Sequence, residues 1–210
     1  MSDHHFEEEQ VEALKAWWKE YGTAIVVGVV LGASILGGNK YWQYYTKERS
    51  ESASSLYDQM QQQLKAGKAA AAAQTGKQLI AGYSATPYSA LAALLLAKKA
   101  YDQGNTDKAL QHLRWTMENA SEAGLQHTAR LRLAAQLKAD NKYQPALDLL
   151  VQVTDTAGFE SAYAELTGDL KVKLGDREAA RKSYRQALAT LQPNSGYRFV
   201  IEQKLADLGA

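Results

Sequence analysis

Residues 161–193, SAYAELTGDLKVKLGDREAARKSYRQALATLQP, show most clearly how the larger part of this chain folds. Two stretches rich in Ala, Leu, Lys and Arg, all good helix formers, lie on either side of Gly175-Asp176. A helix-stopping glycine between two such stretches is typical of a tight turn. Small residues in each stretch, Gly168 and Ala180, would let two antiparallel helices cross closely. The segment therefore predicts a helix–turn–helix unit.

The same arrangement occurs twice before this unit. SALAALLLAKKAYDQGNTDKALQHL (89–113) is interrupted at Gly104-Asn105, and TARLRLAAQLKADNKYQPALDLL (128–150) at Asp140-Asn141. The small residues Ala109, Ala146 and Ala180 of the second helices recur at intervals of about 34 to 37 residues, close to the period of tetratricopeptide repeats. We therefore expect residues 87–193 to form tetratricopeptide-like repeats stacked into an all-α solenoid.

The flanking segments complete this prediction. Residues 194–210, which include GYRFVIEQKLADL, predict a capping helix over the open end of the stack. Residues 43–86 predict a stalk followed by a degenerate first helix pair. The chain has three prolines among 210 residues, and this scarcity favours an all-helical fold.

A membrane anchor is predicted upstream of the repeats. The segment YGTAIVVGVVLGASILGGN, Tyr21 to Asn39, contains no charged residue and approaches the ~20 residues that span a bilayer as a helix. Aromatic residues lie at both ends, as in interfacial belts, and we assign residues 21–42 to the anchor. Two alternatives are a buried core helix, which would show a polar stripe, and a cleaved signal peptide, which would start with a short basic region and end at a cleavage site. The segment shows none of these features, which favours an uncleaved anchor.

The anchor carries two further signals. Residues 1–20 precede it and are expected to form an arm with an amphipathic helix on the membrane surface. Gly28 and Gly32 form a small-xxx-small pattern that allows close packing with another membrane helix, although glycine is also simply tolerated in lipid. Lysine and arginine are nearly balanced on the two sides, so the charges leave the orientation open.

Composition and motifs argue against catalysis. The net charge of +1 offers no electrostatic reason to expect nucleic acid, and the absence of cysteine excludes thiol chemistry and cysteine-based zinc sites. No phosphate-binding loop, nucleophile elbow or H-E-x-x-H motif is present. We therefore expect no catalytic residue, no metal, no cofactor and no small-molecule substrate, and no enzyme activity.

The concave face of the repeats is the expected binding surface. Its expected residues are Lys98, Tyr101 and Asp102 in the 89–113 unit, Leu131 and Lys138 in the 128–150 unit, and Glu165, Asp169 and Lys173 in the 161–193 unit. This mixture of charged and apolar side chains suits weak binding of varied polypeptides. The alternative is an ordinary solvated face.

The chain resembles the YfgM family of bacterial inner-membrane proteins. The resemblance is carried by QVEALKAWWKEYGTAIVVGVVLGASILGGNKYW (10–42), by Tyr57 and by the repeat domain, and it covers almost the whole chain. It implies an ancillary subunit of the SecYEG translocon, with a cytoplasmic N-terminus and a periplasmic helical domain. It also implies partnership with the periplasmic chaperone PpiD and transfer of translocating polypeptides to chaperones.

The sequence leaves two other functions open. The main alternative is a cytoplasm-facing tetratricopeptide scaffold of another inner-membrane complex, which would have the same fold in the opposite orientation. The other is an enzyme, which would need a nucleophile–base pair or a metal site.

Overall fold

The computed structural model describes residues 3–156 and 158–209, and every regular element in these ranges is an α-helix. The predicted all-α fold class is thereby confirmed. Two compact units, Met1–Glu51 and Ser52–Ala210, are each described by themselves. In chain order the helices are α1 (Asp3–Lys65), α2 (Ala69–Gly82), α3 (Pro87–Asp102), α4 (Thr106–Asn119), α5 (Ala123–Ala139), α6 (Tyr143–Val151), α7 (Glu160–Lys173), α8 (Arg177–Thr190) and α9 (Arg198–Ala206).

Helix α1 carries the apolar stretch of the first unit. Val29, Ile35 and Leu36 are 65, 70 and 71% exposed. Exposed apolar surface costs roughly 25 cal/mol per Å² in water, so this stretch is far more stable in lipid. Among the described residues, α1 is the helix long and apolar enough to cross a membrane. It passes without a break through residues predicted as surface arm, anchor and stalk, so these segments share one backbone conformation.

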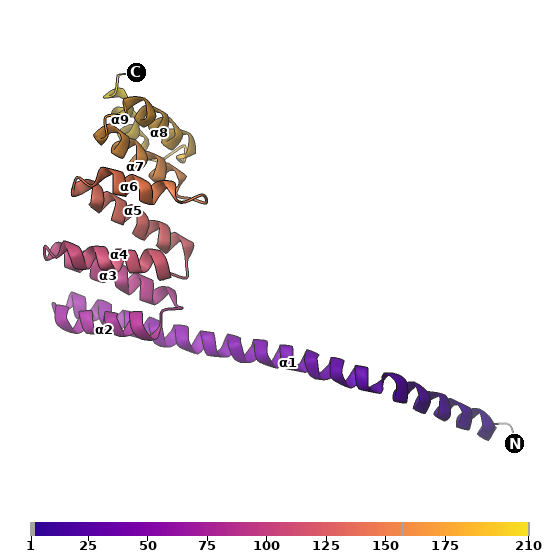
Figure 1. The fold of residues 1–210 in the computed structure, drawn as a ribbon. Helices are drawn as coiled ribbons and strands as arrows, with labels where there is room; N and C mark the ends of the chain where they lie inside the picture. Colours follow the sequence, from indigo (N-terminus) through magenta and orange to yellow (C-terminus); the bar gives the residue numbers. More distant parts are fainter. Residues whose placement is uncertain (1–2, 157, 210) are drawn as a thin grey trace. The chain divides into compact units, whose positions relative to one another are not determined.

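In the second unit, helices α2 to α9 stack in chain order (Figure 1). The helices α3 and α4, α5 and α6, and α7 and α8 form antiparallel pairs. First helices also touch one another, α3 with α5 and α5 with α7, whereas the described residues show no comparable contact from α4 to α6 or from α6 to α8. The first helices therefore line the inner, concave face of the stack.

The turn inside each helix pair has one recurring conformation. Its central residue has positive φ: Gly67 (72°), Gly104 (74°), Asn141 (60°) or Gly175 (83°). The next amide donates to the carbonyl five residues earlier, as Asn105 N does to Ala100 O at 2.8 Å. Glycine adopts positive φ without steric cost and asparagine tolerates it, so these residues end the first helix and start the turn. Gly67 lies between α1 and α2, and the end of α1 therefore acts as a first helix.

Small residues occupy equivalent positions in every pair. Ala72, Ala109, Ala146 and Ala180 of the second helices are at most 2% exposed. Gly168 in α7 is the tightest of the first-helix positions, because a Cβ there would lie 2.5 Å from Cε1 of Tyr184. Only glycine leaves room for the tyrosine ring.

Helix α9 covers the end of the stack. Its Ile201 is fully buried in a cluster with Ala180, Tyr184 and Ala187 of α8. Gly209, just beyond α9, has a φ of 73°, like the positive-φ residues that follow the other first helices. Helix α9 therefore takes the place of a fifth first helix, and its side chains can reach the inner face.

Candidate binding face on the first helices

An open groove lies on the inner face between α3 and α5. We call it the inner groove; its volume is about 480 Å³. Its apolar residues are Leu94, Ala97, Tyr101, Ala109, Leu113, Ala135 and Ala139, and its polar residues are Lys98, Arg132 and Gln136. A largely apolar hollow with a few polar groups at its edge is the usual form of a binding site for a flexible ligand.

Two predicted residues line this groove, and a third, Asp102, forms an ion pair with one of them. Lys98 and Tyr101 line it, and the ring-bearing side chain of Tyr101 is 54% exposed. Lys98 Nζ lies 3.3 Å from Asp102 Oδ2, in an ion pair whose side chains are 72 and 49% exposed. Such a surface pair contributes little to stability and can exchange its partners at little cost.

Leu131 and Lys173 lie apart from this group. Leu131 in α5 is half-buried and packs against the main hydrophobic core. Lys173 is exposed in the last turn of α7, where a positive charge complements the helix dipole. The structure therefore gives Leu131 a packing role and leaves Lys173 on the surface.

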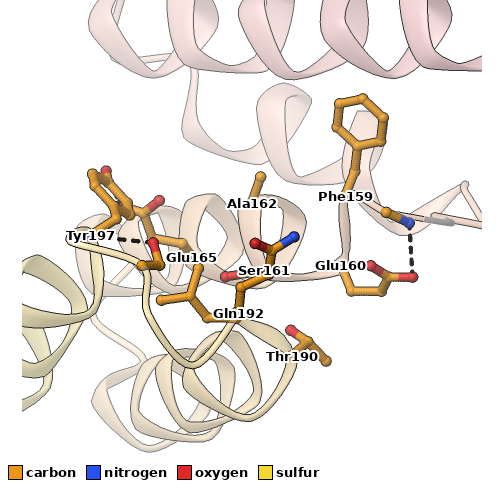
Figure 2. A pocket seen from close by; sticks show the side chains of 11 residues that line it. Phe159, Glu160, Ser161, Ala162, Glu165, Thr190, Gln192 and Tyr197 are labelled. Carbon is orange, nitrogen blue, oxygen red and sulfur yellow. Dashed lines mark hydrogen bonds between the residues drawn. The ribbon is translucent and has the colours of Figure 1, made fainter.

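A smaller pocket of about 300 Å³ lies between the start of α7 and the segment that leads into α9 (Figure 2). Ser161 Oγ donates a hydrogen bond to Ala187 O at 2.9 Å, which ties α7 to α8. Glu160 accepts from the Gly158 amide at 3.1 Å. Glu165 accepts from the Tyr197 hydroxyl at 2.9 Å. These polar groups already bond within the protein and hold the pocket together.

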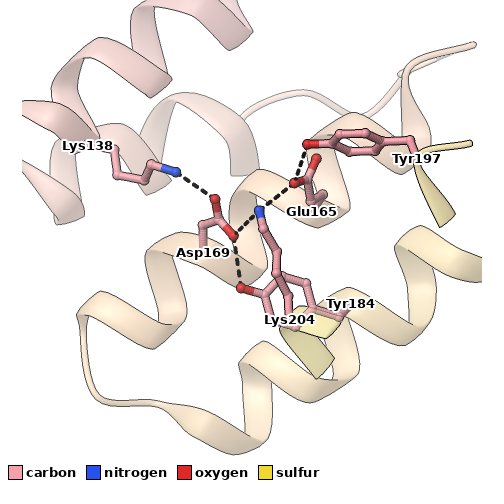
Figure 3. Close-up of polar contacts among 6 residues, drawn as sticks. All are labelled: Lys138, Glu165, Asp169, Tyr184, Tyr197 and Lys204. Atoms are coloured by element: carbon pink, nitrogen blue, oxygen red, sulfur yellow. Dashed lines mark hydrogen bonds and ion pairs between the residues drawn. The ribbon is translucent and has the colours of Figure 1, made fainter. Parts of the chain in front are cut away.

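Three other predicted residues meet in an ionic network at the C-terminal end of the inner face (Figure 3). Asp169 Oδ2 lies 2.6 Å from Lys138 Nζ of α5, and Asp169 Oδ1 lies 2.8 Å from Lys204 Nζ of α9. Lys204 also contacts Glu165 at 2.5 Å. The Tyr184 hydroxyl donates to Asp169 Oδ1 at 2.9 Å. The network thus joins the first helices α5, α7 and α9.

Burial and hydrogen bonding set the protonation states of this network. Burial alone would raise the pKa of Asp169, but hydrogen bonds from Lys138, Lys204 and Tyr184, with the charge of Lys204, hold it below its ordinary value. Burial would lower the pKa of Lys204, and its bonds to Asp169 and Glu165 raise it above the ordinary value. Burial and the bond to Asp169 raise the pKa of the Tyr184 phenol. The carboxylate and ammonium forms are therefore both stabilised at neutral pH.

Comparisons with known proteins agree with this architecture. A family model described as a tetratricopeptide repeat-like domain matches residues 15–210. Proteins named "Ancillary SecYEG translocon subunit" are similar over most of their length: one from Haemophilus influenzae is 33% identical over 86% of this chain and 88% of its own, and one from Escherichia coli is 31% identical over 85% of both. The chain belongs to the YfgM family of ancillary SecYEG translocon subunits.

A solved structure confirms the repeat fold expected for this YfgM-family chain. Nearly identical TPR-like repeats from Podosopora anserina superpose with a TM-score of 0.53, covering 76% of this chain and 86% of the other. Their sequences are 17% identical, so the similarity concerns the fold alone.

Sequence reasoning missed three residues, one in α8 and two in or just before α9, that complete the ionic network of this YfgM-family chain. None of Tyr184, Tyr197 and Lys204 was predicted to make a polar contact, and the C-terminal helix was expected only to cap the stack. Tyr197 immediately precedes α9 and lies seven residues before Lys204, a spacing that puts the two on one side of the helix, as with Glu165 and Asp169 in α7. That spacing was the available signal for a polar contact between α7 and α9.

The glycines predicted to pack in the membrane lie on an open surface. Apart from the nearby backbone of α1 itself and the adjacent residues, a Cβ at Gly28 or Gly32 would have no described atom within 4 Å. Both positions are exposed. They stay candidates for contact with a helix of another protein. Among the described residues of the chain, no group of three or more His, Cys, Asp or Glu side chains is placed to hold a metal ion.

Proposed function

We propose that this protein is a membrane-anchored adaptor of the SecYEG translocon that binds polypeptides through its inner groove. In this proposal α1 crosses the inner membrane with its N-terminus in the cytoplasm, and the repeat domain lies in the periplasm. The bound chains are translocating polypeptides and a periplasmic chaperone of the PpiD type. The role is one of binding and transfer, without catalysis.

The inner groove is the observation that carries this proposal. Its floor of Leu and Ala side chains can bury apolar side chains of a ligand at roughly 25 cal/mol per Å². Tyr101 adds an amphipathic ring, and Lys98 and Arg132 add hydrogen-bond donors at the edge. Such a surface binds many sequences weakly, as a protein that must release its clients requires.

The names of the relatives and the apolar helix support the location. Several curated relatives are named as ancillary subunits of SecYEG, and α1 supplies a helix suited to a bilayer. Gly28 and Gly32, with open space at both positions, would let a helix of the translocon or of the chaperone approach α1 closely.

Site-specific photocrosslinking in cells tests the inner groove. A photoreactive residue at position 101 should capture translocating chains or a membrane-anchored chaperone, identified by mass spectrometry. The matched control is position 114, where an exposed arginine lies on the second helix α4. Equal capture from both positions would contradict binding at the inner groove.

Protease accessibility in spheroplasts tests the orientation separately. Digestion of the repeat domain without lysis is expected if the domain is periplasmic. Protection until lysis would instead support the cytoplasm-facing scaffold of another inner-membrane complex.

Gly28→Leu/Gly32→Leu should reduce co-purification with SecYEG or the chaperone in mild detergent, whereas Gly37→Leu, on another part of the same helix, should not.

A further inference from the structure

A second and larger cleft lies among the C-terminal end of α1 and the helices α2, α3 and α4. Its volume is about 670 Å³, and it shares no lining residue with the inner groove. Met60, Leu64, Ala73, Leu95 and Leu96 contribute an apolar floor. Hollows of this size commonly bury a ligand's apolar groups.

The edge of this cleft is cationic. Lys77 of α2, Lys99 of α3 and Lys108 of α4 all line it, together with the imidazole of His112, and we call the whole hollow the cationic cleft. No aspartate or glutamate is among its lining residues. Within residues 3–156 and 158–209, none of the three lysines forms an ion pair, in contrast to Lys138 and Lys204 in the ionic network.

The pKa of the His112 imidazole responds to the positive charges that line the cleft. Burial lowers the pKa of its imidazole, and the charges of Lys77 and Lys108 lower it further. Lysines of α2 and α4 therefore act on one imidazole in the cleft lining. Positive charges that converge on an apolar floor without a protein carboxylate favour an anionic ligand with apolar groups.

We propose that the cationic cleft binds a polypeptide segment in which apolar side chains are flanked by Asp or Glu. The lysines come from three different helices, so their charges are best matched by carboxylates at several points along a ligand chain. A lipid headgroup carries its charge at one end and would meet only part of this edge. Gln103 and Gln111 add amide groups that can bond a peptide backbone. This site is separate from the inner groove and does not depend on the function proposed for it.

Peptide binding to the full-length protein in neutral phosphatidylcholine nanodiscs tests this proposal. The probe is a fluorescent peptide of about twelve residues built from Leu, Phe, Asp and Glu, and its control has Asn and Gln in place of the acids. The acidic peptide should bind more tightly, with an affinity that falls as salt is added. Lys77→Glu/Lys99→Glu/Lys108→Glu should weaken binding by about tenfold or more.

Two further variants separate local binding from net charge and from misfolding. Lys142→Glu/Lys182→Glu/Arg185→Glu changes the net charge equally on exposed residues elsewhere and should leave binding within about twofold. Ala70→Trp, at an exposed position in the cleft lining, should block binding while the protein stays folded. Bound acidic peptide should also raise the pKa of His112 measured by NMR.

Three results would overturn the proposal. The first is equal binding of the acidic and amide peptides. The second is equal loss of affinity in the two triple variants. The third is binding of monomeric anionic lysophospholipid that needs the three lysines while the acidic peptide does not bind, since the site would then be a lipid site.

Discussion

The inner face has two halves built from equivalent repeat positions, and they differ sharply. Between α3 and α5 it is an open apolar groove, whereas from α5 through α7 to α9 it is closed by charged side chains that bond to one another. Counting from the positive-φ turn residue, Lys98, Ala135 and Asp169 occupy the same position of successive first helices. The same repeat position therefore lines the open groove in two pairs and belongs to the ionic network in the third.

The helix crossings beneath the two halves also differ in the sizes of the residues that face each other. Leu113 and Leu150 occupy the second-helix position that holds Tyr184 in the last pair. The opposing residues of the first helices are Ala97, Ala134 and Gly168. The larger tyrosine requires the smaller glycine, and its hydroxyl then reaches Asp169. A change of size at one helix crossing thus supplies a hydrogen bond to the ionic network.

The largest expected effect comes from breaking this size match. Gly168→Ala places a Cβ 2.5 Å from the Tyr184 ring and should destabilise the repeat domain by about 3 kcal/mol. Denaturant unfolding of the full-length protein in detergent measures the change, and hydrogen exchange locates it in α7 and α8. Gly196→Ala is the control, because beyond the chain neighbours no described atom lies within 4 Å of the added carbon. Adding Tyr184→Leu should recover part of the lost stability. A double variant less stable than Gly168→Ala would contradict the claim that the size of the tyrosine ring requires the glycine.

Removing a charge from the ionic network should cause a smaller loss of stability. Asp169→Asn removes the charge shared by Lys138 and Lys204 and should cost about 2 kcal/mol of unfolding free energy. Asp102→Asn, in the exposed pair of the open half, should cost less than about 0.5 kcal/mol. The same unfolding assay checks both, and similar losses would show that the two halves are equally braced.

The pH dependence of stability should also distinguish the halves. The pKa of Asp169 is lowered in the folded protein, so its contribution is present above the ordinary aspartate value near ~3.9 and is lost as pH falls through the lower folded value. The pKa of Lys204 is raised, so its contribution is present below ~10.4 and is lost as pH rises through the higher folded value. In acid the wild type should lose more stability than Asp169→Asn, and parallel acid profiles would refute this.

The turn glycines should show an effect that is the same in both halves. Gly104→Ala and Gly175→Ala put a Cβ at φ values of 74° and 83°, and each should cost about 1 kcal/mol. Thermal unfolding of the two variants is the measurement. Matching shifts in Tm would show that the turns are common to both halves, so that the difference between the halves arises from the side chains on the inner face.

The helix pairs, their period and the apolar helix α1 could be predicted from the sequence because each depends on neighbours along the chain. Helix propensity, a glycine at a turn and a small residue every 34 to 37 positions are local signals, and the observed turns at Gly104 and Gly175 follow them. Repeat register alone likewise predicted Lys98 and Tyr101 on the inner face, and both line the inner groove.

Only the tertiary structure decided which inner residues are free to bind. Asp169 and Lys138 were predicted as binding residues from the same register, yet they bond to each other and, through Asp169, to Lys204 of α9, 35 residues beyond Asp169 in sequence. Such a bond depends on how far the stack turns between pairs, a property of packed helices that no local pattern encodes. For the same reason the three lysines of the cationic cleft, which come from three helices, line one hollow only in the folded chain.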